Sequence, residues 1–336
     1  MLELSINAKT PASINGAFKK IKEMIVSGAV DKKTPVHLTL DAGVYKEIIK
    51  YNLSNPLVME STNGVGASNC IIQAENCEAF NKGLENRSVF IIGPNATTVT
   101  LKNFSIINTH IKSIDGSNTH ADSAEAFTWN NTTGTLYAEG MRFSGRQNTL
   151  HLKGFSLLKK CYIEGDTDFI YGDCDTALFE ECEIFVREDN RGDNNGYAVK
   201  SLSLANKKGF IFSECTFNAI KRRRASVYLY RTEGKGSVTS PKNWDNAVIL
   251  NCTISEIFNQ ELVWDDDMSL TVFPRGNAVQ GLREYKTKTV SKTNKPMETD
   301  TTKRSIRAYT LTDDDYYKNY SSRFLLLKDT PFAAQF

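Results

Sequence analysis

The first stretch of the chain places apolar residues at the spacing of one helical face. These residues are Ile14, Phe18, Ile21 and Ile25. Residues three or four apart lie on the same side of a helix. Ser13 stands where an N-cap is expected, and Gly28 stands where such a helix would end. The pattern predicts one amphipathic helix at the start of the fold.

From about Val36 onward, helical spacing gives way to short runs rich in β-branched residues. Two examples are residues 36–40, which read Val-His-Leu-Thr-Leu, and residues 96–101, which read Ala-Thr-Thr-Val-Thr-Leu. Short runs of this composition are typical of strands.

Several of these runs share one shape: an apolar residue, two usually polar residues, Cys or Phe, one further residue, then Ile or Phe. They are residues 101–106, 158–163, 179–184, 212–217 and 249–254. A unit of this kind buries its apolar face only by stacking on its neighbours. The repeat predicts an all-β fold, a parallel β-helix with the cysteines as small buried residues. A β-sandwich of similar-looking strands is the alternative.

The last part of the chain is more polar. Residues 287–296 are predicted to form an exposed loop. Thr312 and Asp315 have the spacing of a capping box, which predicts a short helix with Tyr316, Tyr317 and Tyr320 that covers the solenoid. Residues 1–336 are predicted to form a single domain.

Charge and composition limit the kinds of partner and cellular location that the sequence favours. Lys and Arg total 41 against 39 Asp and Glu, a balance that gives no reason to expect nucleic acid as a partner. No apolar run is long enough to cross a membrane. The cysteines number 7, without Cys-x-x-Cys spacing, which favours reduced thiols. We therefore expect a cytoplasmic monomer, or a secreted protein if a signal peptide has been removed.

Common catalytic signatures are missing from the sequence. There is no Gly-x-Ser-x-Gly elbow, no phosphate-binding loop and no His-Glu-x-x-His. The histidines are scattered, at His37, His110, His120 and His151. We expect no metal site and no cofactor.

The most distinctive stretch is residues 165–172, which read Gly-Asp-Thr-Asp-Phe-Ile-Tyr-Gly. An acid that leads into an apolar strand needs stabilising partners or has a function. Asp166 and Asp168 share strand parity, so both could face one surface. The alternative is a turn acid beside a hydrogen-bonded structural acid.

This stretch resembles the most recognisable motif of the pectin methylesterase family. Residues 43–47, Gly-Val-Tyr-Lys-Glu, resemble the family's early Gly-x-Tyr-x-Glu, and residues 147–150, Gln-Asn-Thr-Leu, resemble its Gln-Asp-Thr-Leu. Residues 227–231, Val-Tyr-Leu-Tyr-Arg, resemble the strand that carries its arginine. The motifs stand in the family's order over most of the chain. The resemblance implies a right-handed parallel β-helix.

The resemblance also implies roles in the hydrolysis of methyl esters of galacturonate units, in methylated oligogalacturonide or pectin. Asp168 would attack the ester carbonyl and form an acyl-enzyme. Gln147 would stabilise the oxyanion, and Arg231 would orient Asp168. Tyr171 and Phe169 would line sugar subsites. The alternatives are a surface ion pair for Arg231, an ordinary polar residue for Gln147 and core positions for the aromatic residues.

One departure from the family pattern concerns proton transfer. Asn148 occupies the position of the family's acid/base aspartate, and an amide neither gives nor takes a proton. Glu125 aligns with a segment in which the family has an oxyanion glutamine. We hypothesise that the two have exchanged roles, with Glu125, its pKa raised by Asp168, as acid/base. His151, in place of a family tyrosine, is a second candidate.

Further departures affect the substrate. Glu233 replaces a family tryptophan, which removes an aromatic sugar platform. The basic run at residues 221–224 could attract polygalacturonate or form a solvated face. Three other functions stay open: a catalytically impaired β-helix that binds oligogalacturonides, an esterase for another acyl substrate, and a calcium-dependent pectate lyase, for which no acidic cluster is evident.

Overall fold

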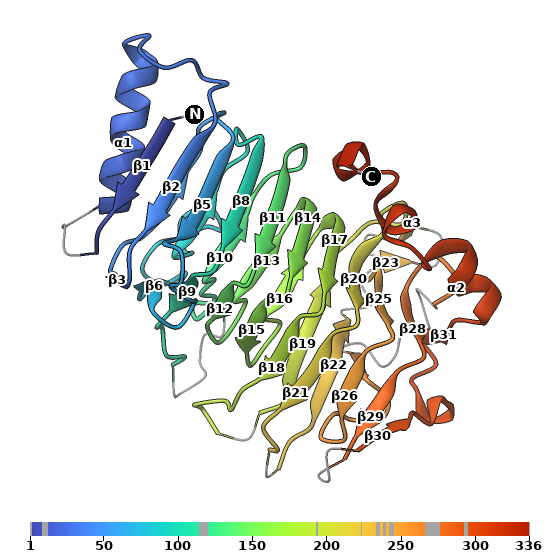
Figure 1. Cartoon of the computed structure of the whole chain (residues 1–336). Coiled ribbons are helices and arrows are strands. Elements are labelled where there is room, and N and C mark those ends of the chain that lie inside the picture. Colours follow the sequence, from blue (N-terminus) through green and yellow to red (C-terminus); the bar gives the residue numbers. More distant parts are fainter. Residues whose placement is uncertain are drawn as a thin grey trace.

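The computed structural model describes residues 2–8, 13–113, 120–192, 194–222, 224–232, 236–237, 240–241, 245–265, 276–291 and 295–335. Strands dominate it, and they run in long parallel sheets along one coil (Figure 1). The chain is a right-handed parallel β-helix, as the sequence predicts.

The first sheet has 11 strands in the order β1 (Leu2–Ile6), β2 (Val36–Leu40), β5 (Leu57–Ser61), β8 (Thr98–Lys102), β11 (Thr135–Glu139), β14 (Gly154–Lys159), β17 (Cys174–Glu180), β20 (Gly209–Ser213), β25 (Ala247–Leu250), β28 (Leu282–Tyr285) and β31 (Ala308–Thr310). It forms the front of Figure 1.

The second sheet has 8 strands: β4 (Ile49–Tyr51), β7 (Phe90–Ile92), β10 (Phe127–Trp129), β13 (Leu150–Leu152), β16 (Ile170–Gly172), β19 (Gly196–Ser201), β22 (Val227–Thr232) and β27 (Val263–Asp265). The third has 10: β3 (Gly43–Tyr45), β6 (Cys70–Ala74), β9 (Ser105–Asn108), β12 (Arg142–Ser144), β15 (Tyr162–Gly165), β18 (Glu183–Val186), β21 (Thr216–Ala219), β26 (Thr253–Ser255), β29 (Lys288–Val290) and β30 (Pro296–Glu298). A short antiparallel pair joins β23 (Gly236–Ser237) and β24 (Ser240–Pro241).

The corner between the first and third sheets explains the sequence repeat. One residue at each corner has a positive φ: Asn103, Gly140, Lys160, Glu181, Glu214, Asn251 and Lys286. A left-handed residue turns the chain sharply. The next residue then points into the core, and in the central rungs it is Cys161, Cys182, Cys215 or Cys252. The repeating Cys or Phe is the first inward side chain after each corner.

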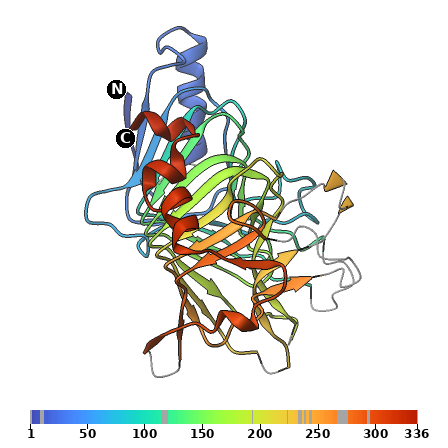
Figure 2. The ribbon, with the colours of Figure 1, turned by 90° about the vertical axis from the view of Figure 1, so that its right-hand side faces the viewer.

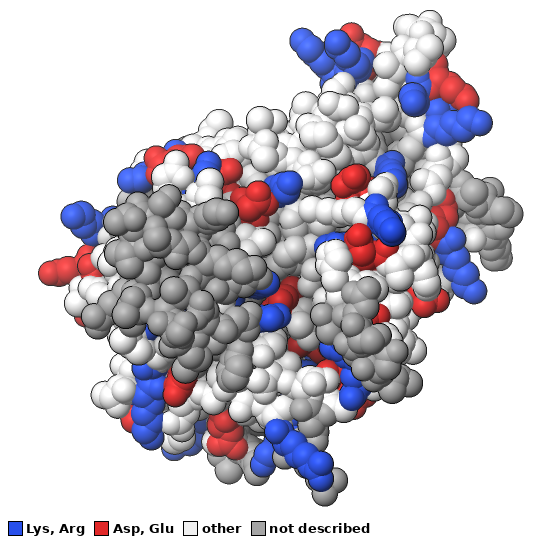
Figure 3. Space-filling model, turned by 180° about the vertical axis from the view of Figure 1, so that it is seen from behind, with Lys and Arg blue, Asp and Glu red and all other residues white. Residues whose placement is uncertain are grey.

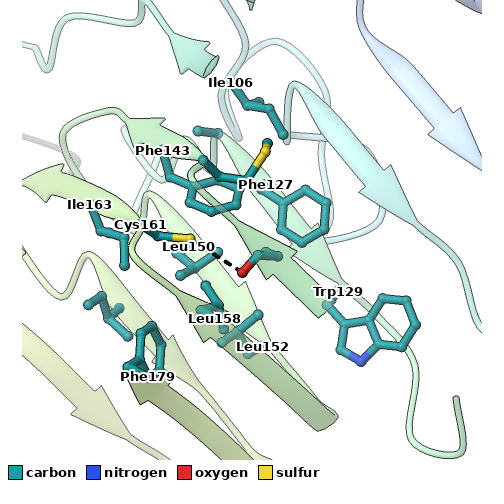
Figure 4. Close-up of a cluster of buried hydrophobic side chains, with 14 of the residues drawn as sticks. Ile106, Phe127, Trp129, Phe143, Leu150, Leu152, Leu158, Cys161, Ile163 and Phe179 are labelled. Atoms are coloured by element: carbon teal, nitrogen blue, oxygen red, sulfur yellow. Dashed lines mark hydrogen bonds between the residues drawn. The ribbon is translucent and has the colours of Figure 1, made fainter. Parts of the chain in front are cut away.

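The cysteines fill the core as small side chains, as predicted. Each thiol in the column donates to a carbonyl oxygen of the preceding rung, for example Cys215 Sγ to Phe179 O at 3.4 Å. All seven cysteines are buried and free. Figure 4 shows Cys161 among large apolar side chains such as Phe143 and Leu150. The interior is therefore a continuous apolar column rather than a pore.

Helix α1 (Ser13–Val26) covers the N-terminal end of the coil (Figure 1). Its buried side chains are Ile14, Phe18 and Ile21. The backbone N–H groups of Ile14 and Asn15 donate to the Glu47 carboxylate at 3.0 and 2.9 Å. A carboxylate at a helix N-terminus satisfies unpaired donors and stabilises the helix dipole.

The C-terminal helices α2 (Asp313–Asn319) and α3 (Arg323–Leu327) lie along one side of the coil (Figure 2). The predicted capping box of Thr312 and Asp315 begins α2. Leu326 and Leu327 pack on outward side chains of the first sheet, such as Leu178. Short 3₁₀ helices cover Thr301–Lys303 and Pro331–Gln335.

The loop predicted for residues 287–296 is wrong in part, because β29 continues the third sheet and pairs with β30 in antiparallel fashion. Residues 292–294 lie outside the described part. Among the described helices, none has both the length and the apolar character needed to span a membrane.

Candidate active site

Asp168 and Asn148 occupy equivalent corners on adjacent rungs, directly before the second sheet. Gln147 forms a parallel β-bridge with Thr167, and Leu150 pairs with Ile170. Asn148 therefore lies opposite Asp168 on the next rung. Both have left-handed backbones, with φ of 64° for Asn148 and 48° for Asp168. Asn and Asp tolerate this conformation better than most residues. The corner turns their side chains away from the strict alternation of a strand.

Two cations approach the Asp168 carboxylate. Arg231 Nη1 donates to Oδ2 at 2.8 Å, and Lys200 Nζ lies 3.8 Å from the same oxygen. The Asp168 residue is 6% exposed. The Arg231 guanidinium also lies over the Tyr197 ring, 5.1 Å from its centroid. Opposite charges at this distance favour the ionised carboxylate.

Gln147 and Asn148 bring amide groups to the same edge. Both residues are half-buried. Gln147 Nε2 lies 3.4 Å from Ser123 Oγ, its hydrogen-bond acceptor. Primary amides donate N–H groups, but they do not act as general acids or bases at neutral pH. The corner therefore holds a carboxylate, an arginine, a lysine and two amides.

Glu125 lies one rung before Asn148 and is fully buried. Arg87 Nε donates to both of its carboxylate oxygens at 3.0 and 2.9 Å, and Nη2 donates at 2.7 Å. The Tyr171 hydroxyl also donates to Glu125. Glu78 accepts from Arg87 Nη1 at 3.0 Å.

The buried Glu125 changes the pKa of its two hydrogen-bond donors, Arg87 and Tyr171. Burial disfavours the Arg87 charge, but hydrogen bonds and the charge of Glu125 outweigh burial, so the pKa of Arg87 lies above its usual value. Burial and the charge of Glu125 also raise the pKa of Tyr171. The hypothesis that Glu125 transfers protons stays a prediction, and Arg87 opposes it because a bidentate cation stabilises the carboxylate form.

His151 and Tyr171 lie side by side on the outer face of the second sheet, with ring centroids 4.7 Å apart. Burial, with the charges of Lys153 and Arg87, lowers the pKa of His151 to about 3. The ring is neutral at neutral pH. Both side chains line a cavity of about 460 Å³ whose wall also includes Arg87, where they could contact a ligand.

Phe169 requires a correction. Its side chain is 0% exposed and belongs to the central apolar cluster. The position after the Asp168 corner points into the coil, so Phe169 does not line a sugar subsite.

Asp166 does not share the surroundings of Asp168. It accepts from Lys112 Nζ at 2.6 Å, and Lys112 Nζ also lies 3.3 Å from Asp189 Oδ1. Burial opposes the charge of Asp189, but Lys112, Arg191 and Asn194 together outweigh burial, so the pKa of Asp189 lies below its usual value. Asp166 and Asp168 therefore have different partners, and the left-handed backbone of Asp168 breaks the strand alternation on which the expectation of one shared surface rests. Asp166 is the structural acid of the alternative interpretation.

Sequence reasoning missed Lys200, Arg87 and Lys112. Each stands outside the recognised motifs and is far in sequence from the carboxylate with which it pairs. Arg87 and Glu125, for example, are 38 residues apart. Lys112 is 1% exposed, although its local sequence, His-Ile-Lys-Ser, carries no sign of burial. The one available signal for Lys200 is its place in an apolar strand.

The basic run at residues 221–224 is divided in the structure. Arg222 is buried and donates to the carbonyl oxygens of Asn194 and Arg187. Lys221 and Arg224 are exposed. Arg223 and Glu233 lie outside the described residues. Among the described residues, no three His, Cys, Asp or Glu side chains are grouped to hold a metal ion.

Seen from behind, the molecule has charged side chains gathered in a hollow near the middle of the face (Figure 3).

A family model described as pectinesterase matches residues 8–312. The chain belongs to the pectinesterase family. The motif resemblance noted from the sequence is thereby confirmed at the level of the family.

Relatives of this pectinesterase-family chain are distant. It is 28% identical to putative pectinesterase 14 of Arabidopsis thaliana over 217 residues. This match covers 62% of the chain and 61% of the relative. It is 21% identical over 266 residues to probable pectinesterase/pectinesterase inhibitor 64 of the same plant, which covers 75% of this chain and 42% of the relative. The matches span less than two thirds of these relatives' own length.

Among solved structures, the chain resembles pectin methylesterase PemA from Erwinia chrysanthemi, with a TM-score of 0.71 and 20% identity over 98% of both chains. At this identity the likeness shows the shared β-helix fold.

Proposed function

We propose that this chain is a carboxylic ester hydrolase that removes methyl esters from galacturonate units of oligogalacturonide or pectin. The observation that carries the proposal is the ion pair of Asp168 Oδ2 and Arg231 Nη1, 2.8 Å apart. It orients the carboxylate and favours its nucleophilic form. Membership of the pectinesterase family and the fold shared with a pectin methylesterase support the substrate class.

The proposed reaction begins when Asp168 attacks the ester carbonyl carbon. Methanol leaves, and an acyl-enzyme forms on the aspartate. The amides of Gln147 and Asn148 donate to the oxyanion of the tetrahedral intermediate. Water then attacks the acyl-enzyme, releases the galacturonate and restores the Asp168 carboxylate.

Methanol release from highly methylated pectin and from short methylated oligogalacturonides tests the proposal. We expect release by the unaltered chain and background release by Asp168→Asn, because an amide is a poor nucleophile. Asp314→Asn is the matched control, since Asp314 is exposed on α2. Equal rates of methanol release by all three proteins would contradict the role of Asp168 as nucleophile. No methanol release by any of them would contradict the proposed esterase activity.

A second function, binding of oligogalacturonide without turnover, is favoured by Asn148, which cannot transfer protons. Isothermal titration calorimetry with methylated oligogalacturonide measures binding and, together with the methanol assay, distinguishes the two functions. Binding without methanol release supports the second function, and restoration of release by Asn148→Asp would locate the defect at that position. A cytoplasmic location stays a prediction, supported by the seven free cysteines.

A further inference from the structure

The proposed ester hydrolysis moves a proton twice, and the residues already assigned do not move it. Methoxide must receive a proton to leave as methanol, and the attacking water must lose one. The Gln147 and Asn148 amides do neither, and an arginine keeps its proton. Arg87 holds both oxygens of Glu125.

Lys200 lies beside the nucleophile. It pairs with Tyr171 in the second sheet, while its neighbour Val199 points into the core with 0% exposure. The Lys200 side chain therefore lies on the outer face, where it is 16% exposed, and its Nζ is 3.8 Å from Asp168 Oδ2.

The position of the ammonium fits proton transfer. Val199 pairs with Tyr230, so Lys200 and Arg231 lie next to each other and approach one carboxylate from adjacent strands. Arg231 makes the short contact that orients Asp168. The Lys200 distance is longer than a hydrogen bond. The methoxy oxygen of the ester is bonded to the carbon that Asp168 attacks, so it comes close to the carboxylate that the Lys200 ammonium also approaches.

We propose that Lys200 is the acid and base of the ester hydrolysis, an inference that rests on the proposed function. As the tetrahedral intermediate collapses, the bond from carbon to methoxy oxygen breaks and Lys200 gives a proton to that oxygen, which leaves as methanol. The neutral amine then takes a proton from water as the water oxygen bonds to the acyl carbon. Asp168 leaves as a carboxylate, and Lys200 is an ammonium again.

Lys200→Arg separates proton transfer from charge, because arginine keeps the charge but does not give up its proton. We expect the first-turnover rate of methanol release to fall by about 10²–10⁴-fold in Lys200→Arg and in Lys200→Met. A trifluoroethyl ester of the same oligogalacturonide has a leaving group that needs less protonation. Its first-turnover rate should fall much less in both variants.

A second variant tests rescue. Asn148→Asp supplies a carboxylate opposite Asp168, so we expect Asn148→Asp with Lys200→Met to release methanol far faster than Lys200→Met alone. Circular dichroism checks that each variant is folded.

An unchanged methyl-ester rate in Lys200→Arg would overturn the inference and leave the proposed function intact. Equal losses on both esters, without rescue by Asn148→Asp, would reduce Lys200 to a positioning residue and also overturn it. No methanol release by the unaltered chain would overturn the proposed function and this inference together.

Discussion

At the scale of single residues, Glu125 and Arg87 form a buried ion pair next to the proposed site. Glu125→Gln leaves the Arg87 charge without its main partner, so we expect the free energy of unfolding to fall by about 3–5 kcal/mol. Urea titration measures the change. Glu78→Gln removes the outer carboxylate of Arg87, and the Glu78 side chain is 17% exposed. Because Glu125 still pairs with the arginine in this variant, we expect a smaller loss than in Glu125→Gln.

The same variant bears on catalysis. If Glu125→Gln abolishes methanol release while its stability stays within error of the unaltered protein, Glu125 transfers protons and the interpretation of a structural ion pair is wrong.

His151 makes stability depend on pH. Its pKa is lowered from 6.5 to about 3 in the folded protein, so the unfolded chain binds a proton at higher pH than the folded protein does. Stability attributable to this residue is therefore complete above pH 6.5 and is lost as the pH falls toward 3, by about 1.4 kcal/mol per pH unit.

Unfolding of the unaltered protein and His151→Phe across this pH range measures the effect. We expect the variant to lose less stability on acidification, because its ring does not bind a proton. His120→Phe is the control, since the His120 side chain is 74% exposed. Parallel pH curves for the unaltered protein and His151→Phe would show that His151 titrates normally.

The candidate site was predictable where its residues stand in contiguous motifs. Such motifs predict Asp168, Gln147 and Arg231 as site residues, and the structure brings Gln147 and Asp168 to neighbouring corners. Lys200 and Arg87 were not found, because a single basic residue in a strand has no local pattern that names its partner. The charge of Lys200 becomes informative only when the coil places it beside Asp168.

At the scale of the element, the left-handed corners determine where each rung turns. Glu214 has φ of 55° and an exposed side chain. Valine is strongly disfavoured there because its branched Cβ meets the backbone. We expect Glu214→Val to lower the free energy of unfolding by about 1–2 kcal/mol, and Glu214→Asn to leave it nearly unchanged.

Thr216→Val is the matched control, because Thr216 lies in strand β21 of the same rung. A β-branched residue fits a strand, so we expect a change of about 0.5 kcal/mol or less. Urea midpoints at constant slope compare the variants. Equal losses at positions 214 and 216 would show that the corner conformation is not the cause.

These corners also explain why strands were more predictable than loops. The inward residue after each corner must be small or apolar, so the repeat is visible in the sequence, as at Cys182 and Cys215. Residues 288–290, Lys-Thr-Val, belong to a polar run that predicts a loop. In the structure their side chains are exposed or half-buried. This strand forms because β26 offers a parallel partner, which local sequence does not reveal.

At the scale of the whole molecule, a solenoid requires closed ends. Strand β1 is the terminal strand of the first sheet, and α1 covers this end with Ile14 and Ile21 at 0% exposure. An uncovered end presents apolar rungs and unpaired backbone groups, which favour association with other chains.

Ile21→Asp tests this role of α1. The variant buries a carboxylate without a partner or displaces the helix, so we expect a lower midpoint of thermal unfolding and a larger mean mass in light scattering after size-exclusion chromatography. Lys22→Asp is the control, because it adds the same side chain at the next, exposed position of the helix. If both variants match the unaltered protein in mean mass and in the midpoint of thermal unfolding, the end of the coil is stable without α1 packed on it. If Ile21→Asp alone associates, the helix is a cap that keeps the coil from extending into a neighbouring molecule.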